Sequence, residues 1–153
     1  KNPVKEWRVR RQMGIVEDDD AYFPELTVVE FLWWVARLRN LTDTECAVQT
    51  EYLSHCFYID KRLDDFIGSL SHGMRRKVLI ASAFLGQPKI MLLDEPTNGL
   101  DVDSLDALCR LLQEHRQNSG IAILACHDSQ FIARVCSEVV TMENGKVIRQ
   151  NPR

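Results

Sequence analysis

The sequence predicts an α/β fold in which a mostly parallel sheet forms a core that carries a small α-helical subdomain. Three short apolar runs, at 13–16, 90–93 and 121–125, show no polar alternation, which is typical of strands buried on both faces of a parallel sheet. Stretches with helical periodicity separate these runs. With 153 residues, of which 45% are apolar, the chain has the size of about one domain.

The composition argues against several classes of protein. The formal net charge of −3 gives no general reason to expect nucleic-acid binding. The five cysteines are odd in number and show no Cys-x-x-Cys spacing, which argues against a disulfide framework and a zinc site and for a reducing compartment. No apolar run approaches the roughly 20 residues that a membrane-spanning helix needs.

Two capping boxes mark the helices of the expected subdomain. Thr27 with Glu30 begins one helix, and Thr42 with Glu45 begins a second. The helical subdomain is expected at residues 26–74, and the core at residues 1–25 and 75–153.

The C-terminal third is expected to form two helices and a closing hairpin. The helices are predicted at 102–117 and 128–135. Strands at 138–142 and 146–149 flank Asn144-Gly145, a dipeptide that favours a type I′ hairpin turn.

Two adjacent carboxylates follow the second apolar run. Asp94 and Glu95 come directly after Ile90–Leu93, and Pro96 then prevents further strand pairing. In open α/β sheets, ligands bind at the carboxyl ends of the strands, where acidic side chains suit a metal ion and the water that attacks a phosphate. Taken alone, these residues also fit a buried strand that runs into an acidic turn.

His127 follows the third apolar run, so it is expected at the same edge of the sheet as Asp94 and Glu95. An imidazole at this edge can reach the γ-phosphate of a nucleotide. His55 and His115 have no such placement and are interpreted as ordinary polar side chains.

A glycine-containing turn precedes the helix expected at 74–85. Ser71, His72 and Gly73 lie in this turn, and the free N–H groups and dipole of a helix N-terminus favour an anion such as phosphate. An ordinary serine N-cap is the alternative interpretation of Ser71. The basic run at 75–77 is interpreted as a solvated helix face rather than a nucleic-acid patch.

In this order, the motifs resemble those of the ATPase domain of ABC transporters, a P-loop NTPase with a RecA-like core. Leu70–Met74 resembles the signature motif, and Ile90–Glu95 resembles the Walker B strand with its catalytic glutamate. Thr97–Asp101 matches the D-loop, and His127 matches the switch histidine. The resemblance covers nearly the whole chain.

The resemblance implies roles in ATP hydrolysis for residues of one edge of the sheet. Glu95 is expected to act as general base or to polarise the attacking water, and His127 to contact the γ-phosphate. Asp94 is expected to hold Mg²⁺, through water.

Other residues are implied to serve the ATP of a second ATPase domain in a head-to-tail dimer. Ser71, His72 and Gly73 are expected to contact that ATP, and Asp101 to couple the two sites. His72 replaces a consensus glycine and Met74 a consensus glutamine. Both changes look tolerable, because Ser71 and Gly73 carry the phosphate contacts.

Asp18 departs from the family pattern. Alignment of the first apolar run places it where the Q-loop glutamine contacts the magnesium ion and the attacking water. A carboxylate can ligate Mg²⁺ through oxygen, but it is a poorer donor to water or phosphate. A solvated acidic turn is the other interpretation of this residue.

The resemblance implies the ATP-hydrolysing subunit of an ABC transporter, which acts through ATP-driven dimer closure. The subunit would lie at the cytoplasmic face of the membrane, with a transmembrane permease and a second ATPase domain as partners and without nucleic acid. A groove in the helical subdomain would receive the permease's coupling helix, with Trp33 or Trp34 in it. Packing within the subdomain is the alternative for each tryptophan.

The P-loop sequence G-x-x-x-x-G-K-[ST] does not occur in residues 1–153. The family places it upstream of the Q-loop, so we expect a longer domain of which this chain is the C-terminal part, and no ATPase activity from residues 1–153 alone. The alternatives are an ATPase-like domain that has lost nucleotide binding and acts as a regulatory module, and a soluble ABC-type ATPase of translation or DNA repair.

Overall fold

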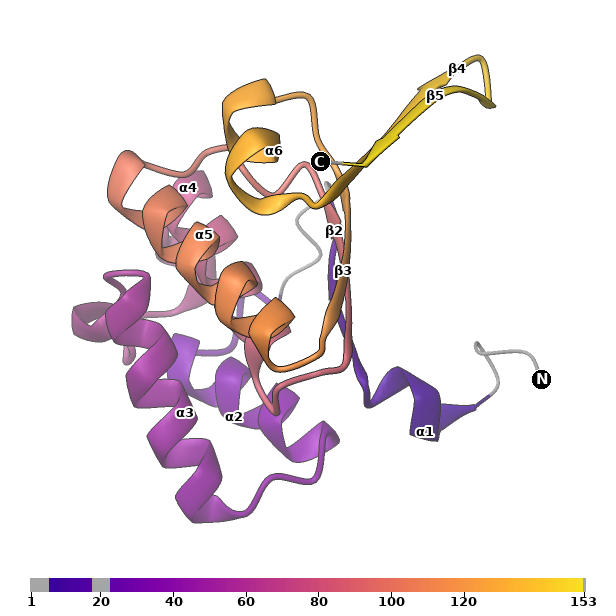
Figure 1. The fold of residues 1–153 in the computed structure, drawn as a ribbon. Helices are drawn as coiled ribbons and strands as arrows, with labels where there is room; N and C mark the ends of the chain where they lie inside the picture. Colours follow the sequence, from indigo (N-terminus) through magenta and orange to yellow (C-terminus); the bar gives the residue numbers. More distant parts are fainter. Residues whose placement is uncertain (1–5, 18–22, 153) are drawn as a thin grey trace.

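The computed structural model describes residues 6–17 and 23–152. Within these residues, three parallel strands form a sheet of order β1-β2-β3 (Figure 1). The strands are β1 (Met13–Val16), β2 (Ile90–Asp94) and β3 (Ile121–Ala125). The predicted α/β class with a parallel sheet is therefore confirmed.

The three strands begin level with one another. Met13 pairs with Ile90, and Ile90 pairs with Ile121. The ladder is joined at this end by bonds from Ile90 N to Gln12 O at 3.1 Å and from Ile121 N to Lys89 O at 2.9 Å. In a parallel sheet with this register, the carboxyl ends also meet at one edge.

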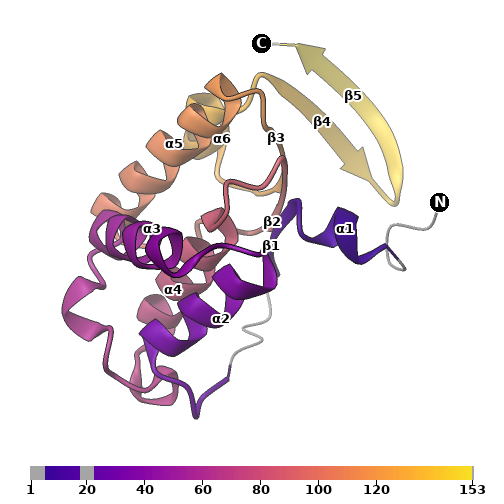
Figure 2. The same ribbon diagram turned by 90° about the horizontal axis from the view of Figure 1, so that it is seen from below.

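Helices α2 to α6 gather on one face of the sheet, as Figures 1 and 2 show. Helix α4 (His72–Phe84) packs against β1, and α5 (Val102–Gln117) packs against β3 and against α6 (Ser129–Val135). Helix α4 begins two residues before the predicted position. No helix in the described part of the chain is long and apolar enough to cross a membrane.

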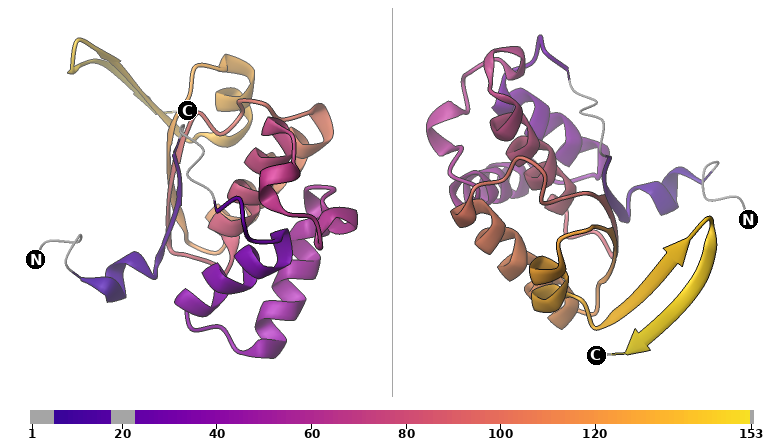
Figure 3. Two further views of the ribbon diagram at one scale, coloured as in Figure 1. Left: turned by 180° about the vertical axis from the view of Figure 1, so that it is seen from behind. Right: turned by 90° about the horizontal axis from the view of Figure 1, so that it is seen from above.

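The opposite face of the sheet is left open by the described residues (Figure 3). Ile15, Leu92 and Ile123 are paired in register and therefore share this face. Ile15 is 49% exposed and Ile123 is 61% exposed. The prediction that β1 and β3 are buried on both faces is therefore wrong here, because an apolar run shows that a strand suits burial without showing which segment covers it.

The hairpin forms as predicted and stands away from the sheet (Figure 3). Strands β4 (Glu138–Glu143) and β5 (Lys146–Pro152) pair antiparallel in a sheet of their own. Asn144 and Gly145 have φ angles of 49° and 75°, as a type I′ turn requires. Near the other end of the chain, α1 (Trp7–Arg10) is a single turn.

Both predicted capping boxes are present in the helices that precede α4. In α2 (Val28–Leu38), the side chain of Thr27 accepts from Glu30 N, while Thr27 N donates to the Glu30 carboxylate at 2.8 Å. The same reciprocal pair begins α3 (Asp43–Cys56). Two short 3₁₀ turns, at Asp60–Arg62 and Ile67–Ser69, lead from α3 to α4.

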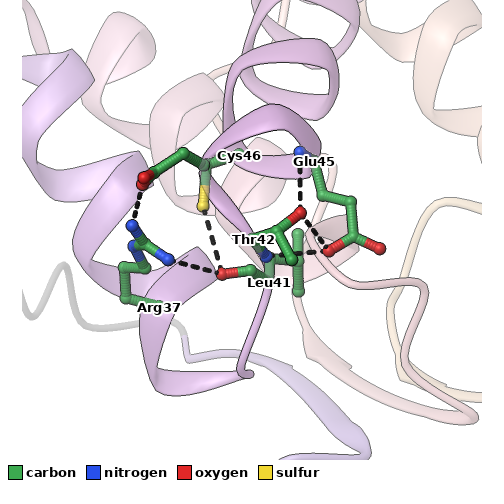
Figure 4. A network of polar contacts seen from close by, with 6 residues as sticks. Arg37, Leu41, Thr42, Glu45 and Cys46 are labelled. Carbon is green, nitrogen blue, oxygen red and sulfur yellow. Dashed lines mark hydrogen bonds and ion pairs between the residues drawn. The ribbon is translucent and has the colours of Figure 1, made fainter.

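Polar contacts join the end of α2 to the start of α3 (Figure 4). Thr42 N donates to the Glu45 carboxylate at 2.7 Å. Arg37 donates to Leu41 O at 2.9 Å and also pairs with Asp43, the first residue of α3. The two helices are therefore fixed relative to each other by local contacts that the sequence pattern predicts only in part.

Candidate functional site

Asp94 and Glu95 lie at the carboxyl edge of the sheet, as predicted. Asp94 is the last residue of β2 and is exposed. Glu95 follows with a φ angle of 41°, in the left-handed region that residues other than glycine rarely adopt. Its N–H donates to Ala125 O at 2.8 Å, so β3 holds the first residue beyond β2.

The structure brings Glu95 and His127 together from the ends of two adjacent strands. His127 Nδ1 lies 2.8 Å from Glu95 Oε2, with the imidazole 76% exposed and the carboxylate 24% exposed. The hydrogen bond and the charge of Glu95 raise the pKa of His127 above its ordinary 6.5, and Asp128 adds to the rise. The arrangement thus favours a cationic imidazole beside a carboxylate, and a cation at this edge suits an anionic phosphate.

The donor chemistry at this edge fits Mg²⁺ bound together with phosphate. Within residues 6–17 and 23–152, no three His, Cys, Asp or Glu side chains gather into a metal site of their own. Mg²⁺ in phosphoryl-transfer sites usually takes one or two carboxylates, and substrate phosphates and water complete its coordination. Asp94 offers such a carboxylate, and its role as a metal ligand stays a prediction.

Ser71 is the N-cap of α4. Met74 N donates to Ser71 Oγ at 3.3 Å, so the capping interpretation of this serine is observed. The hydroxyl keeps its own hydrogen for an acceptor such as a phosphate oxygen, and Ser71 and His72 are exposed. The predicted phosphate contacts of Ser71, His72 and Gly73 stay predictions.

The turn that begins α4 is in contact with the stretch Thr97–Asp101. A Cβ atom on Gly73 would lie 2.7 Å from Gly99 O, and Gly99 itself has a φ angle of 74°. A side chain at Gly73 would push the two segments apart, and a side chain at Gly99 would be strained by the positive φ angle. The two motifs that the sequence suggested separately therefore form one contiguous surface.

Asp101 is held between two helices. Its Oδ1 accepts from Ser104 N at 3.0 Å, which caps α5, and its Oδ2 accepts from Lys77 Nζ at 2.6 Å. The hydrogen bonds from Lys77 and Ser104 lower the pKa of Asp101 to about 2. The coupling role expected for Asp101 is untested, whereas its tie to α4 is a geometric fact that the sequence did not predict.

The prediction that residues 75–77 form a solvated helix face is wrong. Arg76 is 1% exposed and Lys77 is 9% exposed. Arg76 is followed by the buried residues Ile80 and Ala83, at i+4 and i+7 of the same helix, and this periodicity is the signal that could have revealed its burial. The sequence favoured a solvated side chain because an arginine is rarely buried unless its charge is paired.

Asp18 lies outside the described residues, so its predicted place at the Q-loop is not tested. The preceding residue, Glu17, is described, and its carbonyl accepts from Arg76 Nη1 at 2.5 Å.

The chain has the P-loop NTPase fold. A solved ATP-binding subunit of an ABC transporter matches with a TM-score of 0.89 and 31% identity, over 95% of this chain and 61% of that one. A dimeric ATP-binding cassette, solved after hydrolysis with ADP and phosphate, matches with a TM-score of 0.84 over 95% of this chain and 65% of its own. At 22% identity, this second match shows the fold alone.

The family model of the ABC transporters matches residues 1–98, and the chain belongs to this family.

Curated relatives come from bacteria and eukaryotes. The methionine import ATP-binding protein MetN 1 of Listeria innocua is 33% identical over 149 residues, which are 95% of this chain and 44% of that protein. The ABC transporter ATP-binding protein NatA of Bacillus subtilis is 29% identical over 92% of this chain and 57% of its own length. Human phospholipid-transporting ATPase ABCA3 is 32% identical over 76% of this chain and 7% of its own length. The chain thus spans well under two thirds of each of these relatives.

Proposed function

We propose that the chain is part of the ATPase domain of an ABC transporter, whose ATP hydrolysis powers transport. The contact between Glu95 and His127 at the carboxyl edge of the sheet, in a chain of this family, carries the proposal. In this proposal, the helical subdomain comprises residues 26–74, and the core comprises residues 1–25 and 75–153.

The residues of the carboxyl edge would divide the chemistry among them. The Glu95 carboxylate would polarise the attacking water and accept its proton, and His127, cationic beside Glu95, would contact a γ-phosphate oxygen. Asp94 would hold Mg²⁺, which neutralises charge on the phosphate oxygens when it is bound. Each of these groups can approach a phosphate because it lies at or just beyond the carboxyl end of a strand.

A second ATPase domain, arranged head to tail with this one, would bind at the surface formed by the start of α4. The exposed turn with Ser71, His72 and Gly73 would contact the ATP of that domain, and ATP-driven closure of the dimer would follow. Asp101 would couple the two sites. The contact between Gly73 and Gly99 supports this idea, because it places the signature turn against the stretch that follows Glu95.

The P-loop would be supplied by a segment outside these residues. A groove of about 460 Å³ runs along β3 and is lined in part by Ile121, Ile123 and Val140. A buried P-loop strand placed beside β3 would cover these apolar side chains and pair the edge of β3 that the described residues leave unpaired. We therefore expect residues 1–153 alone to lack ATPase activity.

An aromatic cluster formed by Phe23 and two residues of α2 is our candidate for the permease contact. The rings of Phe23 and Trp34 pack edge to face with centroids 5.0 Å apart, and Phe31 joins both. Phe23 and Trp34 are 42% and 45% exposed, whereas Trp33 packs against the core. An apolar surface of this kind suits a coupling helix of a transmembrane permease, with the ATPase peripheral at the cytoplasmic face of the membrane.

The experiment is a comparison of Glu95→Gln with the parent in the full-length protein. ATP turnover should fall by more than a hundredfold, while ATP-dependent dimerisation persists, because only the activation of water is lost. Glu51→Gln, an exposed glutamate on α3, is the matched control and should retain turnover. A parent without ATPase activity, or a Glu95→Gln variant within a few-fold of the parent, would contradict the proposal.

A further inference from the structure

Arg76 is a buried cation that bonds to the main chain at the ends of two strands. Its side chain is 1% exposed, and it stands on the second turn of α4. Nη1 donates to Glu17 O at 2.5 Å, and Nη2 donates to Asp94 O at 2.6 Å and to Glu95 O at 2.9 Å. A buried charge is tolerated only where such bonds satisfy it, so the guanidinium and the three carbonyls depend on each other.

Two of these carbonyls lie on either side of the Cα atom of Glu95. Asp94 O and Glu95 O accept from Arg76, and Glu95 N donates to Ala125 O at 2.8 Å. The residue between them has a φ angle of 41°. A non-glycine residue keeps this conformation only where its surroundings hold it there.

The positive φ angle of Glu95 determines the direction in which its side chain points. A change of φ at Glu95 to the usual negative range would rotate its Cβ about the chain and move the carboxylate away from His127. A displacement of about 1 Å at a reacting group is enough to slow chemistry by about a hundredfold. The backbone contacts are therefore placed where they control the reacting carboxylate.

We propose that Arg76 is a positioning residue for ATP hydrolysis: its guanidinium clamps the two peptide carbonyls beside Glu95 and so aims the carboxylate. The inference rests on the proposed function, because it gives Arg76 a share in a reaction that Glu95 carries. Arg76 itself touches neither nucleotide nor water in this mechanism and acts only through Glu95.

The test uses Arg76→Gln and Arg76→Lys in the full-length protein. For Arg76→Gln, kcat should fall about ten- to a hundredfold, the usual cost of losing a group that orients a reacting side chain. The KM for ATP should stay within about threefold, and ATP-dependent dimerisation should persist. Arg76→Lys keeps the charge but has no planar fork of donors, so its kcat should lie between those of the parent and of Arg76→Gln.

A double-mutant cycle separates positioning from a general structural effect. Single-turnover rates of Glu95→Gln should change less than twofold when Arg76→Gln is added, because Arg76 has nothing left to position. Rate losses that multiply in the double variant would overturn the inference.

Arg39 provides the matched control. It is another largely buried arginine that donates to main-chain carbonyls, those of Met13, Ala83 and Leu85, away from Glu95. Below its unfolding transition, Arg39→Gln should keep kcat within about twofold of the parent. An equal loss of kcat in Arg39→Gln and Arg76→Gln would overturn the inference, since burial alone would then explain both.

The remaining outcomes also support or overturn the inference about Arg76. An active parent with an unchanged kcat in Arg76→Gln would overturn the inference and leave the proposed function standing, whereas an inactive parent would overturn both. If Arg76→Gln does not fold, Arg76→Lys decides: a kcat at least threefold lower at unchanged KM supports the proposal, and the parental kcat overturns it.

Discussion

Each end of helix α4 is fastened to the sheet by an arginine, and the two fastenings have different consequences. At the carboxyl edge, Arg76 joins the helix to the ends of β1 and β2. At the opposite edge, Arg39 reaches from the end of α2 to Ala83 O at 2.9 Å, at the end of α4, and to Met13 O at 3.2 Å, at the start of β1. The chemistry is the same at both edges, a guanidinium that donates to backbone carbonyls.

The two edges differ in the residues whose carbonyls the arginines bind. Those of Arg39 belong to ordinary helix and strand ends, where burial lowers the pKa of Arg39 to about 10 and the group still remains charged near neutral pH. Those of Arg76 flank the strained residue that is our candidate base. The same contact is therefore expected to contribute stability at both edges but reactivity only at the carboxyl edge, so the two substitutions should differ in their effect on kcat.

A large loss of stability is expected when the Arg39 contact is removed. Arg39→Gln leaves up to three partly buried carbonyls without their donor, so the free energy of unfolding should fall by about 3–5 kcal/mol. Urea unfolding of the full-length protein measures this. Arg37→Gln removes an exposed arginine of the same helix (Figure 4) and should cost less than about 1 kcal/mol. Equal losses in the two variants would remove the distinction between a buried clamp and a surface contact.

A smaller effect is expected for Lys77→Met, next to Arg76. The Lys77 ammonium is buried, but its partner carboxylate, Asp101, is 59% exposed, so water can replace the lost contact. The cost should be about 1 kcal/mol after this exposure is allowed for.

The pH dependence of stability checks this interpretation of Lys77. The pKa of Asp101 is lowered from 3.8 to about 2, so its contribution is present above pH 3.8 and is lost as the pH falls toward about 2. Lys77→Met should reduce this acid-dependent loss. If acid unfolding curves of parent and variant differ only by a pH-independent offset, the ion pair is not what lowers the pKa of Asp101.

The smallest effect concerns the contact between Glu95 and His127. Since Glu95 raises the pKa of His127 above 6.5, the stability from this contact is fully present below pH 6.5 and is lost as the pH rises through the raised pKa. NMR titration of the full-length protein should show the raised value, and Glu95→Gln should bring it back toward 6.5. If Arg76 aims Glu95, Arg76→Gln should also lower the pKa of His127, whereas Arg39→Gln should leave it unchanged.

The elements that the sequence predicts well are those with local signals. Thr27 with Glu30 and Asn144 with Gly145 specify a helix start and a turn within a few residues, because capping bonds and positive φ angles are local properties. The carboxyl-edge placement of Glu95 and His127 also follows from local patterns, since each comes directly after an apolar strand.

The features that the sequence misses depend on distant segments. Arg76 is buried because it meets the carbonyls of residues 59 and 18 positions away, and a helix pattern carries no information about those strand ends. The positive φ of Glu95 is likewise imposed by β3 and α4 rather than by its own side chain. The exposure of Ile123 has the same origin, because what covers a strand is decided outside the strand.

The clamp at Glu95 also bears on how this chain can change by mutation. Arg76 recognises carbonyl oxygens, which every amino acid carries, so a substitution at position 17 or 94 keeps its acceptor whatever side chain it introduces. The support of Glu95 therefore depends on the side chain at position 76 alone, and the side chains at positions 17 and 94 are constrained only by their other roles, such as the proposed Mg²⁺ contact of Asp94. A site built in this way can exchange its neighbouring side chains without first rebuilding the support of its base.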